Sequence, residues 1–204
     1  IVDSAVRNFT ERGYHGTSMR DIANGAGVTV ASIYHHFPSK QAILTELMVG
    51  TMSDLLSDTA SAVAEADPSA SARLGAFVRA WTAFHTTRQP EAVIGASELR
   101  SLEPEGRSEV VELRDRQERL LRDLVLDGCA TGEFAVPHPV EAVRVILTSG
   151  AAVASWYRSD GELTPAQLAD RFVDLALSLV SAARRTPDPS APRPASAPDA
   201  GSRS

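Results

Sequence analysis

Apolar side chains recur at helical spacing along most of this chain, and this pattern limits the possible folds more than any other feature. A spacing of roughly three to four residues places such side chains on one face of an α-helix. No segment shows the strict alternation of a half-buried strand. Aromatic residues make up only 5% of the chain, and alanine is abundant, which favours packed helices over sheets. We therefore predict an all-α fold of about nine helices.

Capping residues and breakers divide the first sixty residues into four helices. Gly13 is a good C-cap for a first helix, and Asn24-Gly25-Ala26-Gly27 closes a short second one. Thr29 can cap a third helix over residues 30–36, and Pro38-Ser39 separates it from a long fourth helix that reaches about Thr59. The first three helices would form a small domain over residues 1–46.

The rest of the chain predicts five more helices and a tail. One helix holds Leu74 to His85 and ends at Pro90, and a shorter one covers residues 91–102. A long amphipathic helix follows Pro104 and stops at Gly132. Two more cover residues 140–157 and 164–185, which closes a second domain at residues 47–185. Residues 186–204 lack large apolar side chains and are expected to be a disordered tail.

Composition and charge exclude several classes of protein. Cys129 is the single cysteine, which rules out an internal disulfide framework and fits a reducing compartment. The uncharged, mostly apolar run at residues 145–157 is shorter than the roughly 20 residues that cross a bilayer. We expect no membrane partner and a cytoplasmic location.

The net charge of −6 is unusual for a nucleic-acid-binding protein, but the charge is unevenly distributed. Acidic and basic residues balance within residues 1–50, so the whole deficit lies further along the chain. The first fifty residues can therefore approach phosphate, and the remainder is a poor candidate for that role.

The second and third predicted helices, joined by a glycine-bearing turn, match a helix-turn-helix. The second helix of such a unit enters the major groove, so its first turn must be narrow. Thr29-Val30-Ala31-Ser32 supplies a narrow start, and Tyr34, His35 and His36 follow one turn later, within reach of flanking phosphates.

Three segments of this region resemble the TetR family of bacterial repressors. They are residues 17–23 (TSMRDIA), residues 26–28 (AGV) and residues 32–40 (SIYHHFPSK). The resemblance covers residues 1 to about 48 and implies a homodimer that reads a palindromic operator, with a C-terminal domain that binds a small-molecule inducer. The DNA-binding candidates are Thr17, Ser18, Arg20, Thr29, Val30, Ser32, Tyr34, His35, His36 and Lys40. The resemblance also implies a small core made of Ile22, Ala23, Val28, Ile33 and Phe37.

Several of these candidates have a simpler alternative role. Tyr34 could be a core tyrosine, His36 could pack against the turn, and Arg20 could pair with Asp21. Val30 cannot hydrogen-bond a base, although it can contact a thymine methyl. Lys40, the only lysine, starts a helix, where a phosphate would be favoured by both the helix dipole and the ammonium.

The second domain should hold the inducer pocket and the dimer contact. The pocket candidates are Trp81, Phe84, His85, Leu99, Leu121 and Leu147, for which ordinary core is the alternative. The ligand would be hydrophobic or amphipathic, and Arg100, Arg114 or Arg144 could receive an anionic group, such as a carboxylate or a coenzyme A phosphate. Small and aliphatic faces on the last two helices suggest the dimer interface, and the alternative is the monomer's own core. The interface candidates are Ala151, Ala154, Leu168, Phe172, Leu175 and Leu179.

An enzyme is the main rival class. The five histidines have no metal-ligand spacing, and the chain has no Gly-x-Ser-x-Gly, phosphate-loop or Gly-x-Gly-x-x-Gly pattern. We therefore expect no catalytic residues, metal or cofactor. A second alternative is a DNA-binding activator, or a regulator without a ligand.

Overall fold

The computed structural model describes residues 1–181, and within them the chain forms nine α-helices, one 3₁₀-helix and no strand. The predicted all-α class with about nine helices is confirmed. The elements are α1 (Val2–Arg12), α2 (Met19–Ala26), α3 (Val30–His36), α4 (Lys40–Glu65), α5 (Ala70–Thr87), α6 (Gln89–Ser97), η1 (Glu98–Ser101), α7 (Pro104–Thr131), α8 (Pro139–Trp156) and α9 (Pro165–Val180). The predicted tail, 186–204, lies outside the described residues.

Most helix ends lie where local chemistry predicted them. Ser18, Thr29, Ser39, Ser69 and Thr164 each accept a hydrogen bond from the backbone of the helix that they precede. Helix α9 ends at Val180 and not at residue 185 as predicted, and two other helix ends also differ from expectation. Helix α4 continues to Glu65 instead of stopping near Thr59, and Pro90 does not end α5 but lies in the first turn of α6, where a missing N–H costs nothing.

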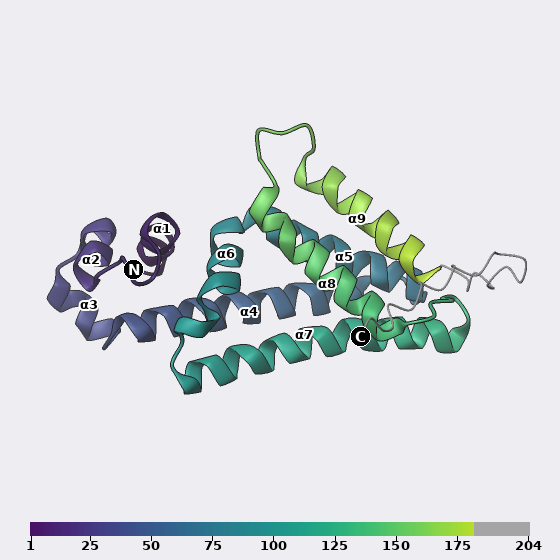
Figure 1. Ribbon diagram of the computed structural model, residues 1–204, viewed down its shortest axis with the longest axis horizontal. Helices are drawn as coiled ribbons and strands as arrows, with labels where there is room; N and C mark the ends of the chain where they lie inside the picture. Colours follow the sequence, from purple (N-terminus) through teal and green to yellow (C-terminus); the bar gives the residue numbers. More distant parts are fainter. Residues whose placement is uncertain (182–204) are drawn as a thin grey trace, which may run out of the picture.

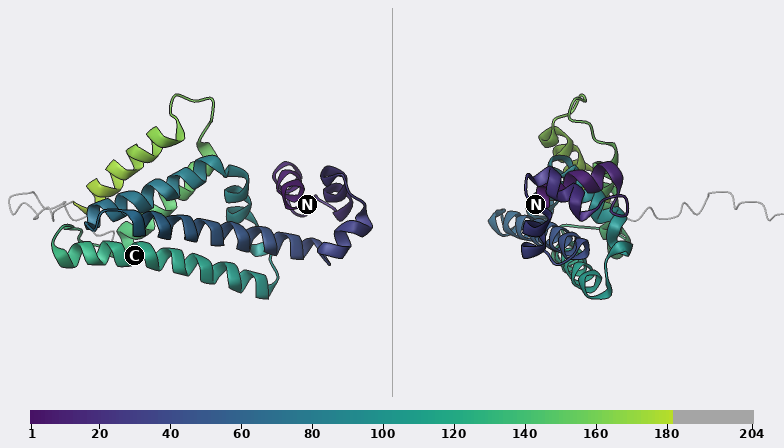
Figure 2. Two further views of the ribbon diagram at one scale, coloured as in Figure 1. Left: turned by 180° about the vertical axis from the view of Figure 1, so that it is seen from behind. Right: turned by 90° about the vertical axis from the view of Figure 1, so that its left-hand side faces the viewer.

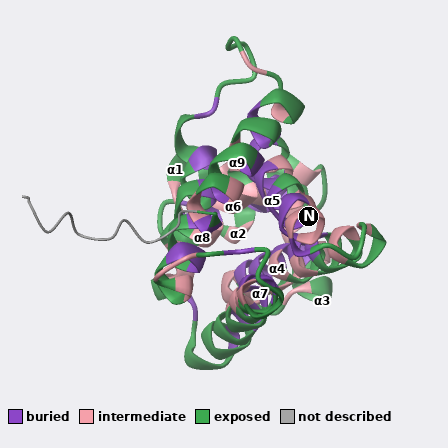
Figure 3. Ribbon diagram, turned by 90° about the vertical axis from the view of Figure 1, so that its right-hand side faces the viewer, coloured by how far each residue is buried: buried purple, intermediate pink, exposed green. Residues whose placement is uncertain are grey.

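The helices form a small head and a larger body (Figure 1). Helices α1, α2 and α3 gather at one end, and α4 runs from them into the body, where α7 lies beside it (Figures 1 and 2). Helix α5 lies at the centre of the body and packs against α4, α7, α8 and α9. Buried residues accordingly lie where the helices face one another (Figure 3).

Two apolar cores hold this arrangement. The body core is built mainly from α5, α7, α8 and α9, with Leu55 of α4. The head core includes Phe9, Ile22, Ile33 and Leu44, but it also takes in Ile94, Leu102 and Val110, which follow far along the chain. The head is therefore closed by side chains of α6, of α7 and of Leu102 in the segment between them. No helix of the described chain is long and apolar enough to cross a membrane.

Candidate nucleic-acid interface and ligand pocket

Two capped helices and a left-handed glycine build the helix-turn-helix. Ser18 accepts a hydrogen bond from the N–H of Asp21 at 3.2 Å, and the Asp21 carboxylate accepts one from the N–H of Ser18 at 2.9 Å. The Ser18 hydroxyl also donates to the Asp21 carboxylate at 2.5 Å, and this bond, together with the one from the Ser18 N–H, lowers the pKa of Asp21 below its usual value. Gly27 ends α2 with φ 68° and ψ 27°, a conformation that favours glycine. Thr29 then caps α3 by accepting from the N–H of Ser32 at 3.1 Å.

The outer face of this unit presents most of the DNA-binding candidates. Ser18, Arg20, Thr29, Tyr34, His35 and His36 are exposed, and Val30 and Ser32 are partly exposed. Tyr34 is 53% exposed, which argues against a core role. Asp21 pairs with Arg12 at 3.1 Å, and among the described residues Arg20 has no ion pair.

The small core differs in one respect from what the resemblance implied. Ile22, Ala23 and Ile33 are fully buried, and Phe37 packs against the same cluster while partly exposed. Val28 is 37% exposed and lies outside the core, because it directly follows the turn at Gly27.

Thr17 and Lys40 have internal partners that the sequence did not reveal. The Thr17 side chain is buried and donates to the carbonyls of Asn8 and Gly13. Contrary to the prediction, it therefore does not lie on the surface where DNA could reach it. The Lys40 ammonium donates to the carbonyls of Tyr14 and Thr17, both at 2.6 Å, and lies 4.2 Å from the Tyr14 ring centroid. Lys40 therefore ties the start of α4 to the loop between α1 and α2, which leaves one N–H for any phosphate.

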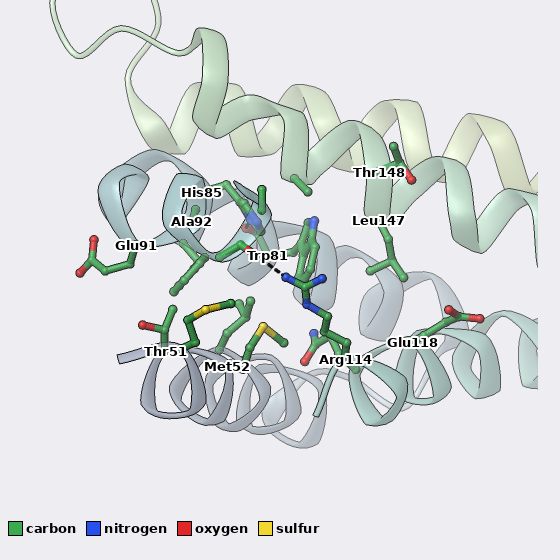
Figure 4. Close-up of a pocket in the computed structure, with 17 residues that line it drawn as sticks. Thr51, Met52, Trp81, His85, Glu91, Ala92, Arg114, Glu118, Leu147 and Thr148 are labelled. Carbon is green, nitrogen blue, oxygen red and sulfur yellow. Dashed lines mark hydrogen bonds between the residues drawn. The ribbon is translucent and has the colours of Figure 1, made fainter. Parts of the chain in front are cut away.

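A cavity of about 500 Å³ lies in the body, between α4, α5, α6, α7 and α8 (Figure 4). Its walls are mostly apolar, a typical composition for a small-molecule site. The lining residues are Met48, Thr51, Met52, Leu55, Trp81, Phe84, His85, Glu91, Ala92, Gly95, Ala96, Arg114, Gln117, Glu118, Leu147, Thr148 and Ala151.

Trp81 and His85 form the aromatic wall of the cavity. The Trp81 ring stacks on Phe77 and lies 4.5 Å, centroid to centroid, from the His85 ring. His85 Nδ1 lies 2.8 Å from the Trp81 carbonyl, and because a carbonyl only accepts, this nitrogen carries the proton. Burial lowers the pKa of His85, so the ring is neutral at pH 7. A Cβ on Gly150 would lie within 2.5 Å of the Trp81 indole, so glycine is required for the close approach of α8.

Arg114 provides the guanidinium of the cavity. Its Nη2 donates to the Gly95 carbonyl at 2.7 Å, and burial lowers its pKa, although it stays protonated. The other two arginines suggested for an anion, Arg100 and Arg144, are exposed and do not line the cavity.

Four of the six predicted pocket residues line this cavity: Trp81, Phe84, His85 and Leu147. Leu121 does not, because it is fully buried in the body core, and Leu99 packs against the head core instead. The sequence analysis missed the contribution of α4, from Met48 to Leu55, whose apolar spacing gives no sign that it faces a cavity instead of solid core.

The dimer-interface candidates divide between buried and exposed positions. Ala154 and Leu168 are buried within the chain, so they are not available to a partner, and Ala151 lines the cavity described above. Leu175 is 65% exposed, and Phe172 and Leu179 are partly exposed. These last three line a shallow apolar groove between α8 and α9 that also includes Val145.

Comparison with known proteins places this geometry in a family. The family model described as "Bacterial regulatory proteins, tetR family" matches residues 1–47, and "Tetracyclin repressor-like, C-terminal domain" matches residues 67–180. The chain belongs to the TetR family. It is therefore a TetR-family transcriptional regulator.

Three regulators match this TetR-family chain along most of their own length. The chain is 30% identical over 179 residues to the HTH-type transcriptional repressor KstR2 of Mycobacterium tuberculosis, covering 87% of this chain and 89% of that one. Among solved structures, a tetR-family regulatory protein from Rhodococcus RHA1 has a TM-score of 0.82 at 27% identity and covers 89% of this chain and 95% of its own. The regulator PfmR of Thermus thermophilus has a TM-score of 0.80 at 32% identity, with 86% and 96% covered.

Proposed function

We propose that this regulator is a repressor that binds a palindromic operator as a homodimer and leaves it when a hydrophobic or coenzyme A-linked molecule occupies the body cavity. The observation that carries the proposal is that one continuous helix, α4, contributes to the head core at one end and lines the cavity further along. The relative named as a repressor supports repression over activation.

Helix α3 is the element proposed to read DNA. Its first turn is narrow, and its outer face presents Thr29, Ser32 and Tyr34. Val30, partly exposed on the same turn, suits a thymine methyl. Ser18 and Arg20 at the start of α2, with His35 and His36, would contact the phosphates on either side.

Two connections couple the cavity to the helix-turn-helix. Along α4, Thr51 at the cavity lies about 16 Å from Lys40 at the head, at the usual rise per residue. Through α6 and η1, Arg114 holds the Gly95 carbonyl, and the Ser101 carbonyl accepts from Gln41 Nε2 at 2.5 Å. A ligand that moves α6 therefore acts directly on the first turn of α4. The ligand would favour a state whose two heads no longer match successive major grooves, and operator DNA would weaken ligand binding in return.

The apolar groove between α8 and α9 is the proposed contact between the two copies. Leu175 is the most exposed of the large apolar residues there, at 65%, and Val145 in the same groove is 54% exposed, so two large apolar side chains are available to a partner. Leu175→Asp should give a monomer by analytical ultracentrifugation and weaken operator binding. Leu126→Asp, at an exposed leucine of α7, is the matched control and should leave both properties unchanged.

Selection of bound DNA from a random pool tests the proposal. A palindrome whose half-sites are centred about 34 Å apart, or a multiple of that, is the expected outcome. Arg20→Ala should weaken binding and make it less dependent on salt, by about one counterion. Arg116→Ala, at an exposed arginine on α7, should not. Failure to enrich any sequence would contradict operator binding, and enrichment without a repeated half-site would contradict the dimer.

A further inference from the structure

The cavity contains a cation with no anion to balance it. Arg114 carries five N–H donors, and in the described part of the chain its one hydrogen bond goes to the Gly95 carbonyl. No carboxylate within residues 1–181 lies within ion-pair distance of this guanidinium. A partly buried charge without a partner is costly unless something else neutralises it.

The two carboxylates that line the cavity do not fill this role. Glu91 accepts from Arg88 Nε at 3.1 Å, and Glu118 lies 3.8 Å from the Arg122 guanidinium. Figure 4 shows both carboxylates pointing away from the centre of the cavity, whereas the Arg114 guanidinium lies at its centre beside Trp81.

The rest of the lining is suited to a hydrocarbon body. Met48, Met52 and Leu55 of α4 and Trp81 and Phe84 of α5 all line the cavity, and Figure 4 shows Met52 and Trp81 on different sides of it. Methionine side chains adapt to irregular apolar shapes, so the side of the cavity formed by α4 can accept hydrocarbon chains of different length.

These observations separate two kinds of anionic ligand. The nucleotide part of a coenzyme A ester carries several phosphate charges, but the cavity offers a single guanidinium and has Glu91 and Glu118 in its walls. A monoanion requires only one cation and leaves the rest of the cavity to apolar contact. The charge balance therefore favours a free acid over a coenzyme A ester.

We propose that the ligand is an amphiphilic carboxylic acid, with its carboxylate held by the Arg114 guanidinium and its hydrocarbon body packed on Trp81 and Phe84. Arg114 would then select the ligand, because a planar guanidinium binds a carboxylate through two parallel hydrogen bonds. The inference deepens the proposed function in that it names the class of inducer, but binding of the acid does not depend on operator recognition.

The test compares matched probes by calorimetry. Decanoate should bind the full-length protein about tenfold to a hundredfold more tightly than 1-decanol, which has the same chain and no charge. Arg114→Gln should lose this preference while still binding 1-decanol, and Arg114→Lys should keep part of it. Arg116→Gln, at an exposed arginine of α7 that does not line the cavity, should behave as the wild type.

Four results would overturn the proposal: equal affinity for decanoate and 1-decanol, a preference that survives in Arg114→Gln, tighter binding of decanoyl-coenzyme A than of decanoate, or no binding of any probe. The helix content of each variant, measured by circular dichroism, and its binding of 1-decanol check that the fold is intact. If decanoate binds through Arg114 and no operator is found, the proposed function fails and this inference stands.

Discussion

The close approach of α8 to Trp81 depends on Gly150, and Gly150→Ala tests it. A Cβ at this position would lie within 2.5 Å of both Trp81 Cδ1 and Trp81 Nε1. The indole cannot move aside easily, because Phe77 stacks on one side and His85 lies against it as well. Either the indole or α8 must therefore shift.

The magnitude follows from comparison with Gly50, which lies within α4 with nothing near its would-be Cβ. Alanine is favoured over glycine in a helix interior by about 1 kcal/mol, so Gly50→Ala should raise the free energy of unfolding by up to that amount. Gly150→Ala has the same gain, but overpacking costs about 1–3 kcal/mol. We therefore expect Gly150→Ala to lower the free energy of unfolding by about 1 kcal/mol, which places it about 2 kcal/mol below Gly50→Ala.

Urea unfolding measures both variants, with the slope checked for constancy. A Trp156→Phe background leaves Trp81 as the only tryptophan, so a red shift of its fluorescence in Gly150→Ala would report a displaced indole. If Gly150→Ala stabilises the protein as much as Gly50→Ala does, the packing of Trp81 against α8 is not as described.

Three further predictions concern the head and the cavity wall. Lys40→Met should lower the free energy of unfolding by about 2–3 kcal/mol, since two charge-assisted bonds and the contact with the Tyr14 ring are lost; an unchanged urea midpoint would contradict this role. Burial lowers the pKa of His85 in the folded protein, so as the pH falls the imidazole is protonated in the unfolded chain before it is protonated in the folded one. The free energy of unfolding should therefore decrease as the pH drops below about 6.5. His85→Gln should flatten that part of the stability curve, and an unaltered pH profile would argue against it. Ser18→Ala should cost about 1 kcal/mol by loss of the α2 cap and should raise the pKa of Asp21, because the Ser18 hydroxyl no longer donates to its carboxylate; an NMR titration would detect this, and a pKa that stays low would assign the shift to the backbone N–H of residue 18 and to Arg12 instead.

The helix-turn-helix was predictable from sequence because its signals are local. Ser18, Gly27 and Thr29 act on residues within one turn of themselves, so their effect can be read from spacing alone. The end of α4 was predicted too early, because the alanine-rich stretch after Thr59 holds no residue that ends a helix before the turn at Asp67-Pro68. The helix continues for as long as nothing ends it.

The site was predictable only in part, because its decisive contacts join distant residues. Lys40 bonds to carbonyls 23 and 26 residues away, and nothing in its own neighbourhood indicates them. Leu121 and Leu147 were both predicted to line the pocket from their helical spacing, yet one lies in solid core and the other beside a cavity. Helical spacing shows which side chains point inward, but it does not show where the interior is empty.

The closure of the head core by Ile94, Leu102 and Val110 has a consequence for building chimeras. Residues 1–46 would leave part of their apolar surface uncovered if they were joined to the body of another regulator. A head exchanged at that boundary would therefore be less stable than either parent unless these three side chains were transferred with it. Ile94 lies in α6, which lines the cavity, and Leu102 directly follows η1, so an exchange that keeps the head folded would also carry over part of the proposed connection between the cavity and the head.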